Sequence, residues 1–198
     1  MYEIDMIGEM LLVARQNQPV TALPVPDDNK EARLVEAVRR GDQEAFGQLY
    51  DLYARMVHGI LLARVPWREV DDLVQDVFLQ AFRMLHTLRD AGAFGGWLAM
   101  ITRNRAMDFH RRTRETEELS EDLPVASQSE AEAEANAVLE IICEMPEAYR
   151  ETLILRLVEG MTGPEIAART GLTPASVRVN LHRGMKLLRE KLGTEIAL

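Results

Sequence analysis

Hydrophobic residues recur every three or four positions from about residue 30 to residue 114, a spacing that predicts amphipathic helices. After a short first helix, Asp42 is the expected N-cap of the second, which we expect to end at Pro66. A third helix is predicted from about Glu69 to Leu88 and, after a glycine-rich loop, a fourth from about Trp97 to Arg112. No strand pattern of any length occurs, so we predict an all-α fold.

The third predicted helix separates its side chains into two faces. Its apolar positions, which we expect in the core, are Leu73, Val77, Phe78, Ala81 and Leu85. Its opposite face carries polar residues: Asp72, Gln75, Asp76, Gln80 and Arg83. The pattern by itself indicates a face exposed to solvent.

A second helical unit is expected from about residue 137 to residue 194, and its best-defined part is a helix-turn-helix. A short helix over 164–170 is followed by Gly171, which can adopt the left-handed conformation of a sharp turn. Thr173 is a good N-cap and Pro174 suits the first helical position, so the next helix is predicted to begin there. In helix-turn-helix proteins this helix enters the major groove of DNA.

The helical angles of this last helix separate residues that pack from residues that could contact DNA. Val177, Leu181, Gly184 and Leu188 are expected to face inward. The exposed side is expected to present Ala175, Ser176, Arg178, Val179, Asn180, His182, Arg183 and Lys186. Arg can bind guanine and Asn adenine, whereas Lys186 is placed to meet phosphate. The same pattern also fits a packing unit whose basic helix contacts only solvent.

Two segments lack the helical pattern. Residues 18–30 contain three prolines, and before them only 4–14 could form a short helix, so we expect an N-terminal extension. Residues 115–136 are acidic and rich in Ser, Ala and Glu, without any aromatic or basic residue, so we expect a flexible acidic linker. The predicted division is an extension (1–30), a first helical domain (31–114), a linker (115–136) and a second helical domain (137–194).

The net charge of −9 is unevenly distributed along the 198 residues. Residues 115–140 hold 9 acidic and no basic side chains, whereas a basic block closes each helical unit. The first block contains Arg103, Arg105, Arg111, Arg112 and Arg114 against Asp108; the second contains Arg178, Arg183, Lys186, Arg189 and Lys191 against Glu190. One basic block is typical of a solvated helix face, but two favour a polyanionic partner.

Composition argues against several other classes of protein. The longest apolar runs, 10–14 and 97–101, are far shorter than the roughly 20 residues that span a bilayer. The first residues are acidic where a secretory signal is basic, so we expect a cytoplasmic protein. The four His and the single Cys143 are dispersed, and no phosphate-binding glycine loop occurs. We therefore expect no metal, no cofactor and no enzymatic activity.

The fourth predicted helix mixes aromatic, cationic and amide side chains. Such a mixture suits unpaired nucleic acid, because rings stack on bases, cations hold the backbone and an amide can bond to a base edge. Asn104 and the glycine-rich loop over 90–96 could together hold a base drawn out of a duplex. Trp97 and Phe109 lie at helical spacing, which is equally typical of core residues.

Several segments, in this order, resemble bacterial sigma factors of the extracytoplasmic-function (ECF) group. Residues 72–83 (DLVQDVFLQAFR) and 94–108 (FGGWLAMITRNRAMD) resemble the second region of that family. Residues 145–153 (MPEAYRETL), with the helix-turn-helix that follows, are similar to its fourth region. The resemblance covers about 33–112 and 137–193.

The resemblance implies a transcription initiation factor that binds core RNA polymerase and recognises promoter DNA at two elements. Core binding, on the β′ clamp helices, would fall to Asp72, Gln75, Asp76, Gln80 and Arg83. Minus-ten binding would fall to Trp97, Arg103, Asn104, Arg105, Asp108, Arg111 and Arg112, with Asn104 at a flipped base. Minus-thirty-five binding would fall to Ser176, Arg178, Val179, Asn180, His182, Arg183 and Lys186. Contact with the β flap, a linker in the RNA channel and an anti-sigma partner are also implied.

Two other hypotheses fit the basic helices. A stand-alone helix-turn-helix regulator would be a dimer that binds duplex DNA without polymerase. An adaptor would use the same helices to hold acidic proteins, without any dependence on DNA. The sigma-factor hypothesis instead predicts a monomer that binds DNA specifically only with core enzyme. Because Arg178, Val179 and Asn180 replace the family's common Lys-Ser-Arg, we expect an altered minus-thirty-five sequence.

Overall fold

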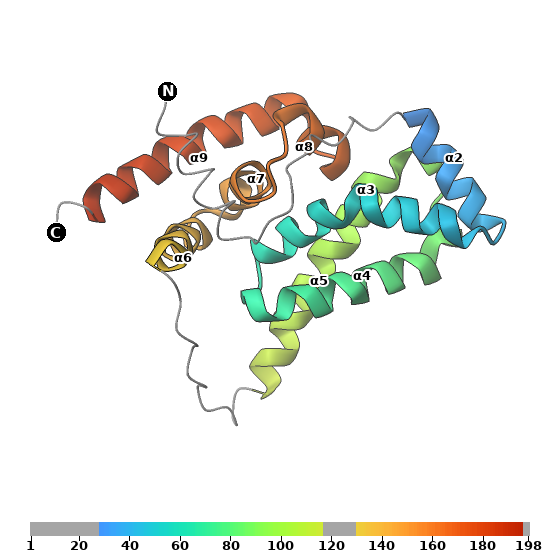
Figure 1. Ribbon diagram of the computed structural model, residues 1–198, viewed down its shortest axis with the longest axis horizontal. Coiled ribbons are helices and arrows are strands. Elements are labelled where there is room, and N and C mark those ends of the chain that lie inside the picture. The colour runs from blue at the N-terminus through green and yellow to red at the C-terminus, as the bar shows by residue number, and fades with distance from the viewer. Residues whose placement is uncertain (1–27, 117–129, 196–198) are drawn as a thin grey trace.

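The computed structural model describes residues 28–116 and 130–195, which form helices and the turns between them. The helices are α2 (Asp28–Arg39), α3 (Gln43–Leu62), α4 (Val70–Met84), α5 (Phe94–Thr116), α6 (Glu130–Cys143), α7 (Glu147–Leu157), α8 (Gly163–Thr170) and α9 (Pro174–Glu195). Short 3-10 turns at Trp67–Glu69, Leu85–Thr87 and Ala91–Ala93 flank α4 and precede α5. Figure 1 shows α2 to α5 as one group and α6 to α9 as another. The described ranges contain no strand, which confirms the predicted all-α fold.

The first group forms as its hydrophobic pattern predicts. Asp42 caps α3 by accepting a hydrogen bond from the Ala45 amide at 3.1 Å, and α3 ends at Leu62, just before Pro66. The predicted inward residues of the third helix, Leu73, Val77, Phe78, Ala81 and Leu85, are all buried. The five polar residues on its opposite face are all exposed. Helix α4 therefore presents one polar face to solvent.

Two helix starts differ from their predicted positions. Helix α5 begins at Phe94 rather than Trp97, because the Asp90 side chain accepts a hydrogen bond from the Gly92 amide at 3.0 Å and starts a turn that leads directly into the helix. Helix α6 begins at Glu130, inside the predicted linker, since its alternating Glu and Ala residues are good helix formers. The tail helix expected over 4–14 and the linker residues 117–129 lie outside the described residues.

Helices α8 and α9 form the predicted helix-turn-helix. Gly171 has a φ of +75°, the left-handed conformation that a side chain would strain. The Thr173 hydroxyl accepts a hydrogen bond from the Ser176 amide at 3.1 Å, so α9 begins at Pro174 as predicted. Thr162 and Glu165 also cap α8 reciprocally, a capping box that the prediction did not include.

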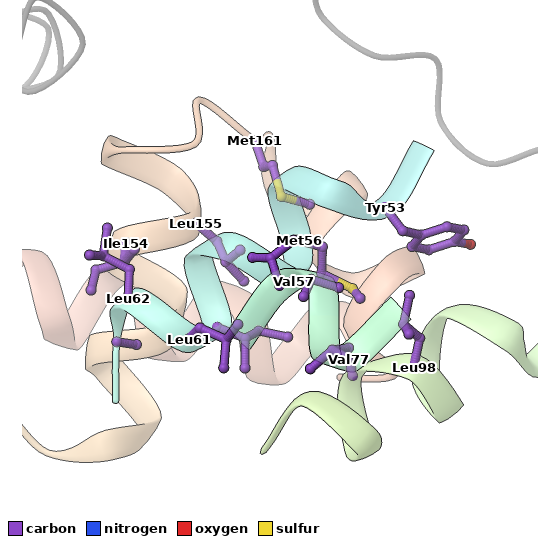
Figure 2. Packing of buried hydrophobic residues seen from close by; sticks show 14 of the residues in the cluster. Tyr53, Met56, Val57, Leu61, Leu62, Val77, Leu98, Ile154, Leu155 and Met161 are labelled. Atoms are coloured by element: carbon purple, nitrogen blue, oxygen red, sulfur yellow. The ribbon is translucent and has the colours of Figure 1, made fainter. Parts of the chain in front are cut away.

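Helix α3 lies at the centre of a core that both helical groups share. Its buried Met56 and Leu62 belong to the same cluster of apolar side chains as Ile154 and Leu155 of α7. Figure 2 shows these side chains around α3. A Cβ at Gly59 would lie only 2.7 Å from Cδ2 of Leu155, so the lack of a side chain there lets α3 and α7 touch. The two domains that the sequence separates by a linker are therefore packed against each other.

Candidate nucleic-acid interface

Helix α9 presents its predicted face to solvent. Exposed residues along it are Ser176, Arg178, Val179, His182, Arg183 and Lys186, and Asn180 is half-buried. On the inner side Val177 and Leu188 are buried, and a Cβ at Gly184 would lie 3.1 Å from Leu153 of α7. The fold thus holds α9 by one side and exposes cationic groups on the other, where Lys186 lies 3.8 Å from Glu190. Side chains exposed in this way can meet base edges in a major groove.

Asn104 lies on the exposed side of α5 between two methionines. Met100, one turn before it, is 51% exposed, and Met107, one turn after it, is 61% exposed. Thioether side chains are flexible and contact aromatic rings favourably. An amide between two such side chains offers an unpaired base both a hydrogen bond and an apolar surface. The sequence contained this signal, since both methionines share the helical face of Asn104, but the prediction did not single them out.

Trp97 belongs to the core as much as to the surface. Its ring lies 5.8 Å from the ring of Phe94, which in turn lies 5.2 Å from the ring of Tyr53. Trp97 is half-buried by this stack, whereas Phe94 and Tyr53 are fully buried. The stack fixes the start of α5 beside the turn Ala91–Ala93 and leaves part of the Trp97 ring accessible.

The cations of α5 make different contacts. Arg105 of α5 pairs with Asp76 of α4. The ion pair therefore joins a residue that the sequence analysis predicted to bind DNA to one that it predicted to bind the polymerase. Arg111 lies 3.1 Å from Asp108, one turn earlier on the same helix. Arg111 and Arg112 are both exposed. Ion pairs on the surface are weak, so phosphate can replace the carboxylate partners of Arg105 and Arg111.

Arg103 is bound to the second helical group. Its Nε and Nη2 donate hydrogen bonds to Glu151 of α7 at 3.1 and 2.6 Å, and Nη2 of Arg64 lies 2.7 Å from the same carboxylate. Burial by itself would raise the pKa of Glu151, but the hydrogen bonds and charges of Arg103 and Arg64 outweigh burial and lower it from 4.5. The structure thus pairs Arg103 of α5 with α7 of the second helical group.

The exposed face of α4 is more apolar than the sequence pattern indicated. The predicted polar residues Asp72, Gln75, Asp76, Gln80 and Arg83 line it, and Leu79 and Phe82 are about half-exposed among them. Large apolar side chains surrounded by polar ones are typical of a surface that contacts another protein.

The described residues 28–116 and 130–195 were compared with the geometry that metal sites and membrane helices require. No three His, Cys, Asp or Glu side chains there are grouped to hold a metal ion, and no helix there is long and apolar enough to cross a membrane. The Sγ of Cys143 lies 3.8 Å from the carbonyl oxygen of Leu62, and burial raises the pKa of this thiol. A thiol with a raised pKa is a poor nucleophile.

Comparison with known proteins gives two family matches, one to each helical group. Residues 49–116 match the model of sigma-70 region 2, and residues 135–188 match the model of sigma-70 region 4. The first match covers most of α3 and all of α4 and α5, and the second covers the helix-turn-helix with most of the helices around it.

Individual relatives agree with these matches. The chain is 30% identical over 176 residues to the ECF RNA polymerase sigma-E factor of Escherichia coli K12, which covers 80% of this chain and 92% of that protein. It is 35% identical over 167 residues to the probable RNA polymerase sigma factor RfaY of Xanthomonas campestris, covering 77% of this chain and 41% of that protein. Among solved structures, CnrH in complex with the cytosolic domain of CnrY aligns with a TM-score of 0.60 and 26% identity, covering 83% of this chain and 98% of that chain.

The order of the two matches is also the order of the two helical groups, and near-complete coverage of the Escherichia coli sigma-E factor shows that the whole architecture is shared. The chain belongs to the ECF family of RNA polymerase sigma factors, which direct the polymerase to promoters at the start of transcription and catalyse no reaction themselves.

Proposed function

We propose that this sigma factor recognises its promoter with two surfaces on separate domains. The α5 surface, for the melted minus-ten strand, consists of Trp97, Met100, Arg103, Asn104, Arg105, Met107, Asp108, Arg111 and Arg112. The α9 surface, for the minus-thirty-five duplex, consists of Ser176, Arg178, Val179, Asn180, His182, Arg183 and Lys186. The observation that carries the proposal is the chemical difference between them: one suits unpaired bases, and the other has helix-turn-helix geometry.

The proposed domain division takes its bounds from the helices. We assign region 2 to residues 28–116, from the start of α2 to the end of α5, and region 4 to residues 130–194, because α6 begins at Glu130. The N-terminal extension, predicted over 1–30, then ends before α2 begins at Asp28. The acidic segment between the domains is proposed as the connection that lies in the RNA channel of the polymerase.

The exposed face of α4 is the proposed docking surface for core polymerase. Leu79 and Phe82 provide the apolar contact with the β′ clamp helices, and the five polar residues around them provide the surrounding hydrogen bonds and ion pairs. Region 4 makes the second attachment, at the β flap. The protein thus acts in the cytoplasm, where the polymerase works.

An anti-sigma factor is the proposed regulatory partner. CnrH, which shares the fold, is bound by the cytosolic domain of CnrY in its solved complex. A polypeptide of the same kind that covers the α4 face would compete directly with core polymerase.

Footprinting on a promoter bound by core polymerase tests the division between the two surfaces. With wild-type protein we expect upstream protection and downstream reactivity of unpaired thymines to permanganate. A change in the α9 surface, Arg183→Ala, should remove upstream protection first, and Asn104→Ala in the α5 surface should remove downstream reactivity first. Loss of both signals together in both variants would contradict the division. An exposed control, Gln48→Ala on α3, should change neither.

A further inference from the structure

Helix α2 supplies a buried carboxylate that reaches the start of α5. Glu31 is only 5% exposed, and its Oε1 accepts a hydrogen bond from the Gly95 amide at 3.2 Å. Gly95 is the second residue of α5, and the first amides of a helix have no partner within the helix. A carboxylate at this position therefore satisfies one of these amides and complements the positive end of the helix dipole.

The second oxygen of this carboxylate is held by α3. Oε2 of Glu31 accepts a hydrogen bond from the Tyr53 hydroxyl. Figure 2 shows the Tyr53 ring at the edge of the apolar cluster, with its oxygen directed away from the other labelled side chains. The approach to α5 is close because Gly95 has no side chain: a Cβ there would lie only 3.0 Å from Cε1 of Tyr53. Glu31 thus joins α2, α3 and α5 at one point.

The charge of Glu31 also acts on α8. Arg169 of that helix is buried, and burial lowers the pKa of its guanidinium, whereas the charges of Glu165, Tyr53 and Glu31 oppose this effect. Glu31 can therefore act as a hydrogen-bond acceptor for Gly95 or as a charge near Arg169. A neutral side chain that still accepts a hydrogen bond separates the two actions.

The start of α5 forms one side of the proposed base pocket. The turn Ala91–Ala93 packs against α2 and leads directly into α5, so the hydrogen bond to Gly95 fixes the point where turn and helix meet. Trp97 follows in the first turn of the helix, and Asn104 lies about two turns further on, on the same face. The turn and Trp97 are thus set relative to Asn104 by the way in which α5 begins.

We infer that Glu31 is a positioning residue for promoter opening: by holding the Gly95 amide, it sets the loop over 90–96 and Trp97 at the distance from Asn104 that a flipped base requires. The inference rests on the proposed function, because it takes the α5 surface as the minus-ten contact. Glu31 is buried, so it acts through Gly95 and does not touch DNA itself. It also precedes residues 49–116, so the match to region 2 does not include it.

Three variants of the full chain, each assembled with core polymerase, test the inference. Glu31→Met keeps the length of the side chain but removes both carboxylate oxygens, whereas Glu31→Gln keeps an acceptor oxygen and removes the charge. The matched control, Glu44→Met, makes the first change at an exposed carboxylate on α3. Anisotropy of labelled protein should show the same affinity for core polymerase in all three.

The probe is a fluorescent single strand that carries the minus-ten element of a promoter used by the wild-type holoenzyme in vitro. The strand is either intact or has one abasic site, placed at each position in turn, and the ratio of the two affinities measures recognition of the missing base. In wild type we expect a ratio of about ten at the flipped base, the contribution of one stacked base. Glu31→Met should bring this ratio close to one, and Glu31→Gln and Glu44→Met should keep the wild-type ratio. A role limited to folding would change both affinities alike and leave the ratio as it is.

Two results would overturn the inference while the proposed function stands. One is a folded Glu31→Met protein that keeps the wild-type ratio. The other is a Glu31→Gln protein that loses as much as Glu31→Met, because the charge near Arg169 would then matter and the hydrogen bond to Gly95 would not. Circular dichroism identifies any variant that has unfolded. If Glu31→Met unfolds, Tyr53→Phe decides, since it removes only the hydroxyl that holds Oε2 of Glu31 and should lower the ratio by a smaller factor.

Failure of the proposed function gives a different result. If the wild-type ratio is close to one at every position of the strand, the α5 surface holds no flipped base, and the inference about Glu31 falls with it.

Discussion

At the scale of single residues, the proposed base pocket depends on Asn104. Its amide is exposed between Met100 and Met107, and neither its own helix nor region 4 covers it. We expect Asn104→Ala to reduce open-complex formation about tenfold, the loss of one base contact, while binding to core polymerase is unchanged. Fluorescence of 2-aminopurine in the minus-ten element measures opening, and anisotropy of labelled protein measures core binding. Equal losses in both would rule out a role at the flipped base.

Two cations of the α9 surface should differ in what they recognise. Arg183 lies where a guanidinium can bind a base edge, and Lys186, one turn later, lies where an ammonium meets phosphate. We expect Arg183→Ala to weaken promoter binding about tenfold and to relax the sequence preference. We expect Lys186→Ala to weaken binding to all sequences alike and to lower the slope of log affinity against log salt concentration by about one. Holoenzyme titrations against promoter variants at several salt concentrations separate the two effects. Identical sequence profiles for both variants would contradict the assignment.

The Glu151 carboxylate makes the packing of α7 on α3 and α5 sensitive to acid. Its pKa is lowered from 4.5 because Arg103 and Arg64 outweigh the effect of burial, so the charged group stabilises the folded chain above pH 4.5 and this contribution disappears as pH falls through the lowered pKa. We expect the difference in free energy of unfolding between wild type and Glu151→Gln to be largest near pH 7 and to vanish in acid. Denaturant unfolding of both proteins across this pH range measures it. A difference that is constant with pH would show that the charge of Glu151 does not stabilise this packing.

At the scale of elements, the sharp turn between α8 and α9 depends on Gly171. A side chain at a φ of +75° is strained by about 1–2 kcal/mol, and a Cβ there would also lie 3.3 Å from Cα of Gly96. We expect Gly171→Ala to lower the melting temperature by a few degrees. The matched control is Gly163→Ala at the start of α8, where a Cβ would make ordinary contact with Val177 at 4.0 Å. A control that loses as much stability as Gly171→Ala would mean that the turn conformation is not responsible.

The elements that were predictable from the sequence are those whose signals are local. Helical spacing identified the two faces of α4, and the residues Gly171 to Pro174 identified the start of α9, because caps, turns and periodicity depend on near neighbours. The contact between Arg103 and Glu151 was not predictable in this way. Each of these side chains, taken alone, is an ordinary charge on a helix, and only the packing of α7 on α3 and α5 brings them within 2.6 Å.

At the scale of the whole molecule, the same local reasoning separated the two domains but could not predict how they pack against each other. Glycines that lie unremarkably within helices, such as Gly59 and Gly96, become contact points only when the domains meet. The resulting core includes α3 and α7 together, so the free chain is packed more tightly than two tethered domains would be.

Transcription in vitro with purified core polymerase tests the central claim most directly. The full chain is mixed with bacterial core enzyme that lacks any other sigma factor, and transcripts from genomic DNA of the source organism are mapped at their 5′ ends. We predict that the chain associates with core and that initiation occurs at a limited set of sites sharing two sequence elements about 25 base pairs apart. No association with core, together with no specific initiation at any site, would contradict the account.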